Sequence, residues 1–258
     1  MSVSSLPRRV LGAAVATVLA TTTLALAPLA FAPPASAGDV DGPGFQQPTV
    51  GECRNLPLSE MYTRSNTTAP TDCADPHTLL VFAVPRLPKG MAWSAPMEKL
   101  QITMFNRCRP AWDEFLGRSE AAREMSAYSW AWYIPTKAQR DHGARWFRCD
   151  LLLYGGSRAL QLPDDVAPVL NQPPLPDSVA LCLTLRKYMT ACSRGHAWRA
   201  TGTVRMRGTS YPSARQFQAA GDRCRSRVHS NRYFWNGPSR PEWKLGNRTM
   251  VCFTKTTN

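Results

Sequence analysis

Two cysteine–histidine pairs are the residues of this chain best suited to chemistry. His77 follows Cys73 by four positions in "TDCADPHTLL", and His196 follows Cys192 by four in "TACSRGHAWR". A thiolate and an imidazole together can ligate a metal ion, or act as nucleophile and general base. Both kinds of chemistry need a free thiolate, whereas an oxidised cysteine leaves only a structural joint. The redox compartment of the protein therefore decides between these interpretations.

The first residues of the chain predict export. Arg8 and Arg9 precede a long run rich in Ala, Val and Leu, and the small residues "ASA" end at Ala37. This pattern is typical of a secretory signal peptide, residues 1–37, cleaved after Ala37. A retained membrane anchor is the alternative, because the apolar run is nearly long enough to span a bilayer. We expect a secreted or extracytoplasmic envelope protein that is peripheral rather than integral once the signal is removed.

The cysteine count favours disulfides over a metal site. All eight cysteines lie beyond the cleavage site, at Cys53, Cys73, Cys108, Cys149, Cys182, Cys192, Cys224 and Cys252. An even number of cysteines in an oxidising compartment predicts disulfide bonds. Zinc sites usually contain close pairs such as C-x-x-C, whereas the closest cysteines here, Cys182 and Cys192, are ten positions apart. We expect neither a metal nor a cofactor. The alternative is a metal site of reduced cysteines from distant segments.

An internal repeat divides the chain into two units. When the two histidines are aligned, each has two cysteines before it and two after it. Pro135 and Pro238 each precede the last cysteine of their unit by fourteen positions, and Gly143 and Gly246 by six. Four further pairs match in the same frame: Trp132 with Trp235, Thr136 with Ser239, Gln139 with Glu242, and Arg145 with Arg248. This register predicts a tandem duplication.

The unit boundaries follow from this repeat and from proline content. We place unit 1 at residues 48–156 and unit 2 at 178–256, with an N-terminal linker at 38–47 and a proline-rich linker at 157–177. The stretch "SRALQLPDDVAPVLNQPPLPDSVA" contains five prolines, which would break regular elements and suit an extended, semi-rigid connector.

Each unit is predicted to have an α+β fold, with a short antiparallel sheet packed by one main helix. Apolar and β-forming runs predict strands at 78–84, 126–134 and 145–155 of unit 1 and at 248–255 of unit 2. A helix is predicted over 94–108, because Met97, Leu100, Met104 and Cys108 recur at helical spacing after Ser94, a possible cap, and Pro96. The second helix follows Ser213, with Phe217, Ala220, Cys224 and Val228 on one face.

Units of this size bury only a modest core, so disulfide staples have a sufficient structural role. We expect bridges within each unit: Cys53–Cys73, Cys108–Cys149, Cys182–Cys192 and Cys224–Cys252. The second bridge of each unit would join the helix to a strand. Four cysteines nevertheless allow three pairings per unit.

Several short motifs resemble the bacterial septum formation domain family, here as two tandem copies in an exported protein. In unit 1 the matching stretches are "VGEC" (50–53), "CADPH" (73–77), "CRPAWDEFLG" (108–117) and "PTKAQRDHGARWFRC" (135–149). Unit 2 matches through "CSRGH" (192–196) and "PSRPEWKLGNRTMVC" (238–252). The resemblance implies an exported or membrane-anchored protein connected with septum formation, and it supplies no catalytic residues. The family pattern usually has an acidic residue three positions after the histidine, where this chain has Leu80 and Arg199.

We interpret His77 and His196 as structural, each hydrogen-bonded beside a disulfide, because oxidised cysteines cannot serve as nucleophiles. The functional alternative is an envelope hydrolase in which one of these histidines acts with a residue from elsewhere in the chain. The aromatic side chains raise a second alternative, a platform for a glycan or peptide, although core packing explains them more simply. They are Trp130, Trp132, Tyr133, Trp146, Trp235 and Trp243.

The chain is strongly basic. Without residues 1–37 it has 29 Lys and Arg against 18 Asp and Glu, a net charge of +11, which favours anionic partners. The predicted anion-binding residues are Arg205, Arg207, Arg223, Arg225 and Arg227. On a helix, Arg223 and Arg227 would be neighbours and could clamp a phosphate or carboxylate. The simpler explanation is an arginine-rich solvated surface.

The sequence thus predicts an exported, non-catalytic interaction or scaffold module of the bacterial envelope. It would serve septum formation or cell-wall assembly and bind an envelope protein, an anionic wall polymer or a phospholipid surface. Nucleic acid is not an expected partner of an exported protein.

Overall fold

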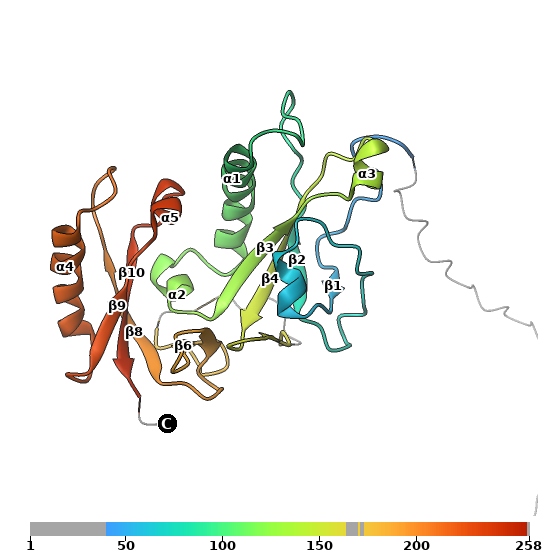
Figure 1. Ribbon diagram of the computed structural model, residues 1–258. Helices are drawn as coiled ribbons and strands as arrows, with labels where there is room; N and C mark the ends of the chain where they lie inside the picture. The colour runs from blue at the N-terminus through green and yellow to red at the C-terminus, as the bar shows by residue number, and fades with distance from the viewer. Residues whose placement is uncertain (1–39, 164–169, 171–172, 257–258) are drawn as a thin grey trace, which may run out of the picture. The chain divides into compact units, whose positions relative to one another are not determined.

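Two five-stranded antiparallel sheets form the frame of the protein (Figure 1). The computed structural model describes residues 40–163, 170 and 173–256, so the predicted signal peptide lies outside the described residues. We call residues 48–156 the first half and residues 178–256 the second half. Each sheet is built mainly from one half, as the antiparallel α+β prediction requires.

The sheet of the first half has the order β1-β2-β4-β3, and β5 also pairs with β4. Its strands are β1 (Cys53–Arg54), β2 (Leu79–Ala83), β3 (Tyr128–Tyr133), β4 (Arg148–Tyr154) and β5 (Ala159–Leu160). The strands of the second half are β6 (Leu181–Leu183), β7 (Met189–Ala191), β8 (Trp198–Arg205), β9 (Tyr233–Asn236) and β10 (Thr249–Lys255). Their order is β7-β6-β8-β10-β9. When β7 is left out, the two sheets have the same strand order: β6, β8, β10 and β9 correspond to β1, β2, β4 and β3.

The pairing register of the last two strands also agrees between the halves. Trp132 of β3 lies opposite Cys149 of β4, and Trp235 of β9 lies opposite Cys252 of β10. The residues that matched in the sequence therefore occupy equivalent positions in the two sheets. The predicted tandem duplication agrees with this likeness, and the division into two tandem units stays a prediction.

Along the chain, helices are interspersed among the strands of both halves (Figure 1). They are α1 (Met97–Phe115), α2 (Glu120–Glu124), α3 (Lys137–Asp141), α4 (Ala214–Asp222) and α5 (Arg240–Lys244), with 3₁₀ helices η1 (Leu58–Tyr62) and η2 (Arg223–Arg227). Ser213 caps α4 as predicted. The prediction that Ser94 caps the first helix is wrong: Pro96 holds the N-cap position, and its side chain makes no capping bond.

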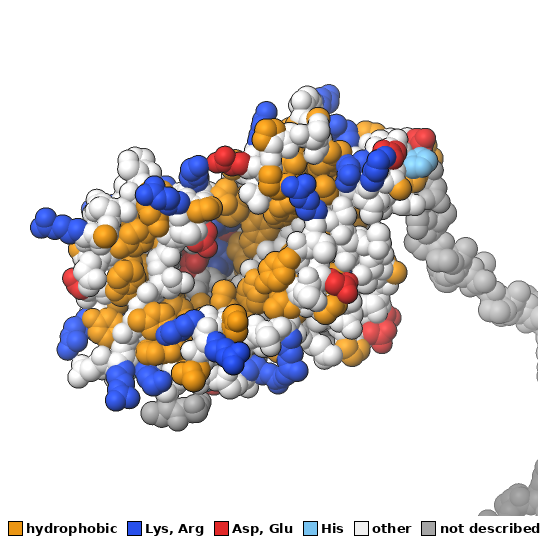
Figure 2. Space-filling model, in the orientation of Figure 1, with side chains coloured by type: hydrophobic (Ala, Val, Ile, Leu, Met, Phe, Trp, Pro, Cys, Tyr) orange, Lys and Arg blue, Asp and Glu red, His pale blue; other side chains and the backbone are white. Residues whose placement is uncertain are grey.

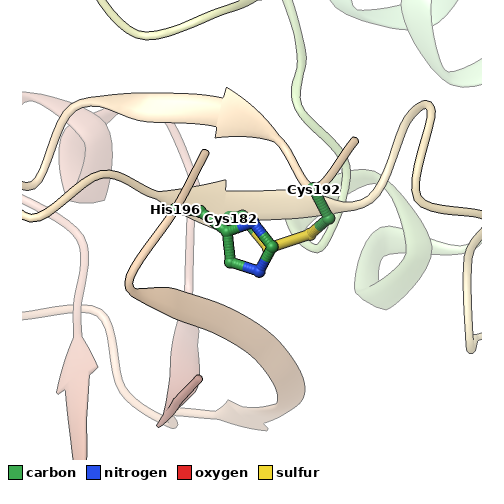
Figure 3. A group of neighbouring side chains, drawn as sticks. All are labelled: Cys182, Cys192 and His196. Carbon is green, nitrogen blue, oxygen red and sulfur yellow. A yellow bond between two sulfur atoms is a disulfide. The ribbon is translucent and has the colours of Figure 1, made fainter. Parts of the chain in front are cut away.

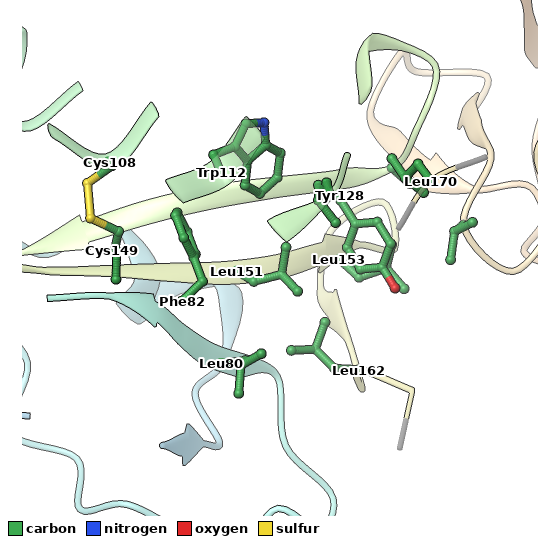
Figure 4. Packing of buried hydrophobic residues seen from close by; sticks show 14 of the residues in the cluster. Leu80, Phe82, Cys108, Trp112, Tyr128, Cys149, Leu151, Leu153, Leu162 and Leu170 are labelled. Carbon is green, nitrogen blue, oxygen red and sulfur yellow. A yellow bond between two sulfur atoms is a disulfide. The ribbon is translucent and has the colours of Figure 1, made fainter. Parts of the chain in front are cut away.

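Helix α1 is longer than the predicted helix. It continues past Cys108 to Phe115, with Pro110 on its exposed side. The buried face of α1 presents Leu100, Met104, Cys108 and Trp112 to the first sheet. Figure 4 shows Trp112 above Phe82 and Leu151, with the Cys108–Cys149 bridge closing one end of this core. Burial of these large side chains, each contributing about 1.5–3 kcal/mol, holds the helix on the sheet.

Described residues of the proline-rich segment belong to the core, which differs from the extended connector predicted for this segment. Leu162, Leu170 and Leu175 are buried in the same hydrophobic cluster as α1 and β4. Ala159–Leu160 forms strand β5, although the prolines were predicted to exclude regular elements; the first proline of the segment comes only at Pro163.

Backbone bonds also connect the halves. The N–H of Ala127 donates to the carbonyl of Val179 (2.8 Å), and the N–H of Leu181 donates to the carbonyl of Met125 (2.7 Å). Residues Ser36–Asn258 accordingly form one compact unit. Within the part of the chain that the structure describes, none of the helices has the length and apolarity required to span a membrane.

Candidate functional site

All eight cysteines are consumed in disulfides, and the four pairings predicted from the sequence are confirmed. The bridges are Cys53–Cys73, Cys108–Cys149, Cys182–Cys192 and Cys224–Cys252. The second bridge of the first half joins α1 to β4, and its counterpart joins η2 to β10. Because no cysteine is free, the thiolate that either kind of cysteine chemistry requires is not present in this state of the protein.

The two histidines have the same local geometry. Nδ1 of His77 lies 2.9 Å from the carbonyl oxygen of Asp75, and Nδ1 of His196 lies 2.8 Å from that of Arg194. A carbonyl only accepts hydrogen bonds, so Nδ1 carries the proton in both rings. The side chains are buried, with 1% of His77 and 9% of His196 exposed. Each imidazole therefore closes the turn that leads into the next strand.

The imidazole of His196 lies against a disulfide, as Figure 3 shows. The ligand atoms of Cys182, Cys192 and His196 lie within 4.8 Å of one another, close enough for a metal ion to bridge them. Both sulfurs, however, are bonded to each other and lack the thiolate charge that a zinc ligand needs. In the oxidised protein this cluster is a packed joint.

The aromatic residues raised as a platform belong largely to the interior. Tyr133, Trp146 and Trp243 are 1%, 4% and 3% exposed, so core packing is confirmed for these three. The indole N–H of Trp146 donates to the carbonyl of Phe45 (2.8 Å), and that of Trp243 to Thr209 (2.9 Å). Trp130 is half-buried against the rings of α1 and β2.

Positive charge is concentrated in the second half. Residues 178–256 contain 15 Lys and Arg but only two acids, Asp222 and Glu242, whereas residues 48–156 contain 13 Lys and Arg and 11 Asp and Glu. The net charges are thus +13 and +2. Asp222 accepts a hydrogen bond from Gln218, and Glu242 completes the capping box of α5 with Ser239. Figure 2 shows basic side chains spread over the visible surface of this half.

Few of these cations are neutralised. Among the described residues, three basic side chains of the second half have a carboxylate partner. The pairs are Arg199–Asp177, Arg205–Glu120 and Lys244–Glu98. Each of the three acids belongs to a part of the chain outside residues 178–256. The second half therefore has a large surplus of positive charge available for an external anion.

The structure brings together two of the five predicted anion-binding arginines. Arg207 follows β8 and Arg223 begins η2, and both line a hollow of about 630 Å³. Its other walls include Thr209, Ser210 and Tyr211. The described residues provide no carboxylate within ion-pair distance of Arg207 or Arg223. Two guanidinium groups beside hydroxyl groups suit a phosphate or carboxylate ligand.

The other three predicted arginines have different surroundings. Arg205 forms an ion pair with Glu120 of α2, and Glu120 also accepts a bond from the Thr249 hydroxyl (2.6 Å). Arg225 donates to Asn231 (3.3 Å), and the side chain of Arg227 packs on Gly202 of β8. Neither Arg225 nor Arg227 lines the hollow.

The predicted clamp between Arg223 and Arg227 is wrong. Helix α4 ends at Asp222, and residues 223–227 form a 3₁₀ helix with three residues per turn. Side chains four positions apart then no longer share a face. The bridge of Cys224 to Cys252 ties this segment to β10, which accompanies the change of helix type.

A second hollow, of about 280 Å³, shares Thr209 and Tyr211 with the first. Arg240 lies over the Tyr211 ring (4.6 Å), and Arg248 lies over the Trp243 ring (3.9 Å). Sequence reasoning missed the contact between Arg240 and Tyr211, because these two residues are far apart in the chain. We call the two hollows together the 207–223 groove.

A titratable carboxyl lies one turn beyond Glu120 on α2. Burial raises the pKa of Glu124 to about 7, and the nearby carboxylates of Glu120 and Glu242 act in the same direction. Arg109 opposes this shift. Of the two carboxylates that raise this pKa, Glu242 belongs to the second half.

A hollow of about 390 Å³ in the first half contrasts with the groove. It is lined by Trp130 and Trp132 of β3, Tyr62 of η1 and Tyr154 of β4. Arg64 is its only lining residue with a formal charge. Aromatic character predominates here, whereas cationic character predominates in the 207–223 groove.

Comparison with known proteins identifies one family. A model of the septum formation family matches residues 106–252, which is more than half of the chain and runs from α1 through the proline-rich segment to β10. No curated protein and no solved structure matched the chain. The single continuous match supports the family assignment and leaves the tandem arrangement as a prediction. The chain belongs to the septum formation family.

Proposed function

We propose that this protein is an exported, non-catalytic module of the bacterial cell envelope that binds anionic polymers through the 207–223 groove. The observation that carries the proposal is the position of Arg207 and Arg223 at one hollow, in a half with 15 basic and two acidic residues. The family assignment supports a role connected with cell division or the envelope. We place the activity in septum formation or wall assembly.

The chemistry of the groove favours repeating phosphate or carboxylate groups. A guanidinium presents parallel N–H donors that match two oxygens of one anionic group. Arg207 and Arg223 provide two such donors in the larger hollow, and Arg240 and Arg248 lie beside the smaller one. A polymer with regularly spaced anions can occupy both hollows at once, and simultaneous contacts increase affinity without any single strong contact.

The state of the cysteines and histidines supports a non-catalytic role. Every cysteine is oxidised, and the Nδ1 atoms of His77 and His196 are occupied by backbone carbonyls. A hydrolase would need one of these imidazoles to reach a substrate, yet His77 is 1% exposed. The hydrolase alternative therefore has no specific observation in its favour.

Binding to isolated cell wall tests the proposal. We would replace Arg207 and Arg223 with Gln in the full mature chain and measure retention on wall fragments and on poly(glycerol phosphate) at low and high salt. The matched control replaces Arg107 and Arg118, two exposed arginines of the first half, and so removes the same charge.

We expect the groove variant to lose about tenfold in affinity at low salt and the control to change by less than about twofold. Salt should weaken the wild-type interaction. Equal losses of affinity in both variants would show that binding depends on net charge alone, and would refute a specific role of the groove. Retention that is insensitive to salt would refute anion binding altogether.

A further inference from the structure

The tip of the β6–β7 hairpin exposes an unusual group of hydrophobic side chains. Among the described residues, seven large hydrophobic side chains are exposed, and three of them lie within five positions: Leu185 (77%), Tyr188 (54%) and Met189 (37%). The other four are scattered over the N-terminal segment and the first half. A single exposed apolar residue needs no explanation, but a contiguous group marks an interaction surface.

This hairpin tip has a defined conformation. The N–H of Lys187 donates to the carbonyl of Thr184 (2.9 Å), and the N–H of Thr184 donates to the carbonyl of Tyr188 (2.9 Å). The Cys182–Cys192 bridge joins the two strands below the tip. The turn that carries these exposed side chains is therefore stabilised by a cross-link.

The hairpin tip contacts a group of aromatic rings through a cation. The Lys187 ammonium lies 3.7 Å from the ring centroid of Trp198 and 3.4 Å from that of Phe234. The Lys255 ammonium lies 5.0 Å from the Trp198 centroid. Arg186 is exposed at the tip itself. Figure 2 shows hydrophobic and basic side chains interspersed on the second half, near the C-terminal end of the chain.

We propose that the hairpin tip inserts into the interfacial layer of a bilayer containing anionic phospholipids, which makes the second half a peripheral membrane-binding surface. Leu185, Tyr188 and Met189 supply apolar contacts at the depth of the headgroups and upper acyl chains. Arg186, Lys187 and Lys255 supply the complementary charge, and long basic side chains can keep their charges at the surface while their stems contact lipid.

The charge of the second half selects this occupant over a neutral protein surface. With a net charge of +13 in residues 178–256, the half is attracted to an anionic bilayer before any apolar contact forms. The inference is independent of the 207–223 groove, because none of the residues at the hairpin tip lines either hollow of the groove.

Vesicle flotation tests the inference with the full mature chain. One set of vesicles contains equal parts of phosphatidylglycerol and phosphatidylcholine, and the other set contains phosphatidylcholine alone. The test variant carries Leu185→Ser and Tyr188→Ser, and both sites are exposed, so we expect its thermal unfolding to match that of the wild type. The R207Q/R223Q variant of the groove serves as the comparison.

We expect the wild type to bind the anionic vesicles at least about tenfold more tightly than the neutral ones, and the hairpin variant to lose at least about tenfold on the anionic vesicles. The hairpin variant should keep its retention on poly(glycerol phosphate), whereas the groove variant should keep most of its vesicle binding. Full vesicle binding by the hairpin variant would overturn the inference. Equal binding of the wild type to both kinds of vesicle would also overturn it, because charge would then have no part.

Insertion itself has a separate readout. In a Tyr188→Trp variant, anionic vesicles should shift the emission of the new indole to the blue relative to the same measurement on wild type, and a quencher attached to the acyl chains should reduce that emission. Binding without either change would show that the protein only adsorbs to headgroups, and would contradict insertion.

Discussion

The two halves share a strand order but differ on the sheet face that lies opposite the main helix. In the first half this face carries Arg148 and Asp150, an ion pair at 2.9 Å whose side chains are 3% and 0% exposed. Arg148 and Asp150 flank Cys149 in the sequence. In the second half, the residues that flank Cys252 are Val251 and Phe253, and they pack in an apolar cluster.

The first cystine loop also differs in length between the halves. Twenty positions separate Cys53 from Cys73, whereas ten separate Cys182 from Cys192. The longer loop covers its sheet: the Tyr133 hydroxyl donates to Met61 (3.3 Å), and Arg148 donates to Asn66 (3.2 Å). The shorter loop is only a hairpin, so Trp198 and Phe234 stay half-exposed. This sheet face is therefore covered in the first half and partly exposed in the second half.

The buried ion pair gives the largest expected difference. Asp150→Ala leaves Arg148 buried without its partner, and we expect it to lower the free energy of unfolding by about 3–5 kcal/mol. Arg148→Met combined with Asp150→Leu gives this face the apolar character of the second half and should cost much less. Urea unfolding followed by tryptophan fluorescence measures both. A double variant as unstable as Asp150→Ala would show that the halves are not interchangeable in this respect.

The helix–strand disulfides should matter similarly in the two halves. Cys108→Ala with Cys149→Ala, and Cys224→Ala with Cys252→Ala, are each expected to cost about 2–5 kcal/mol. The first bridge closes the longer loop, 41 positions against 28, so its loss should be slightly more severe. The loss of stability in each double variant is measured from the midpoint of its urea unfolding curve. A negligible loss in one half would show that the two disulfides are not equivalent.

The stability of the folded protein should depend on pH through Glu124, which lies on α2 of the first half. Its pKa is raised from 4.5 to about 7 in the folded protein, so the folded state binds the proton more tightly than the unfolded state. This contribution to stability is complete below about pH 4.5 and is lost as the pH rises through 7.

Glu124→Gln removes this titration. We expect the stability of the wild type relative to the variant to fall by about 1–3 kcal/mol between pH 4 and pH 8. Unfolding curves of both proteins at several pH values measure the difference. A constant difference across this range would contradict the coupling.

The helix caps should have the smallest and most nearly equal effects. Thr136 with Gln139, and Ser239 with Glu242, form complete capping boxes at α3 and α5. Thr136→Ala and Ser239→Ala should each cost about 1 kcal/mol. Thermal unfolding of the two variants tests this prediction. If their losses of stability differed by more than about 1 kcal/mol, the two capping boxes would not be equivalent.

Local features of the fold were predictable from the sequence. The repeat favoured the four observed bridges, although cysteine spacing alone left three pairings per unit. The matched residues Thr136 and Ser239 mark the same turn in both halves. Gly143 and Gly246 likewise both have positive φ, 90° and 93°, after that turn. These features depend on interactions between residues close in the chain or on covalent pairing.

Features set by distant contacts were not predictable. The change to a 3₁₀ helix after Asp222 occurs where Gly221 closely approaches the Trp235 ring. The burial of Leu162 and Leu170 depends on a core built by α1 and β4. Periodicity alone does not reveal such contacts. The same limit applies to the groove, because an arginine run does not show which cations are neutralised from elsewhere, as Arg205 is by Glu120.

Arginine footprinting tests the central claim, that the second half binds anions and the first does not, most directly. The mature protein would be treated with phenylglyoxal with and without poly(glycerol phosphate), and the modified arginines would be mapped by mass spectrometry. We predict that the polymer protects Arg207 and Arg223 and leaves Arg107 and Arg118 as reactive as before. Protection centred on the arginines of the first half, or no selective protection, would contradict the account.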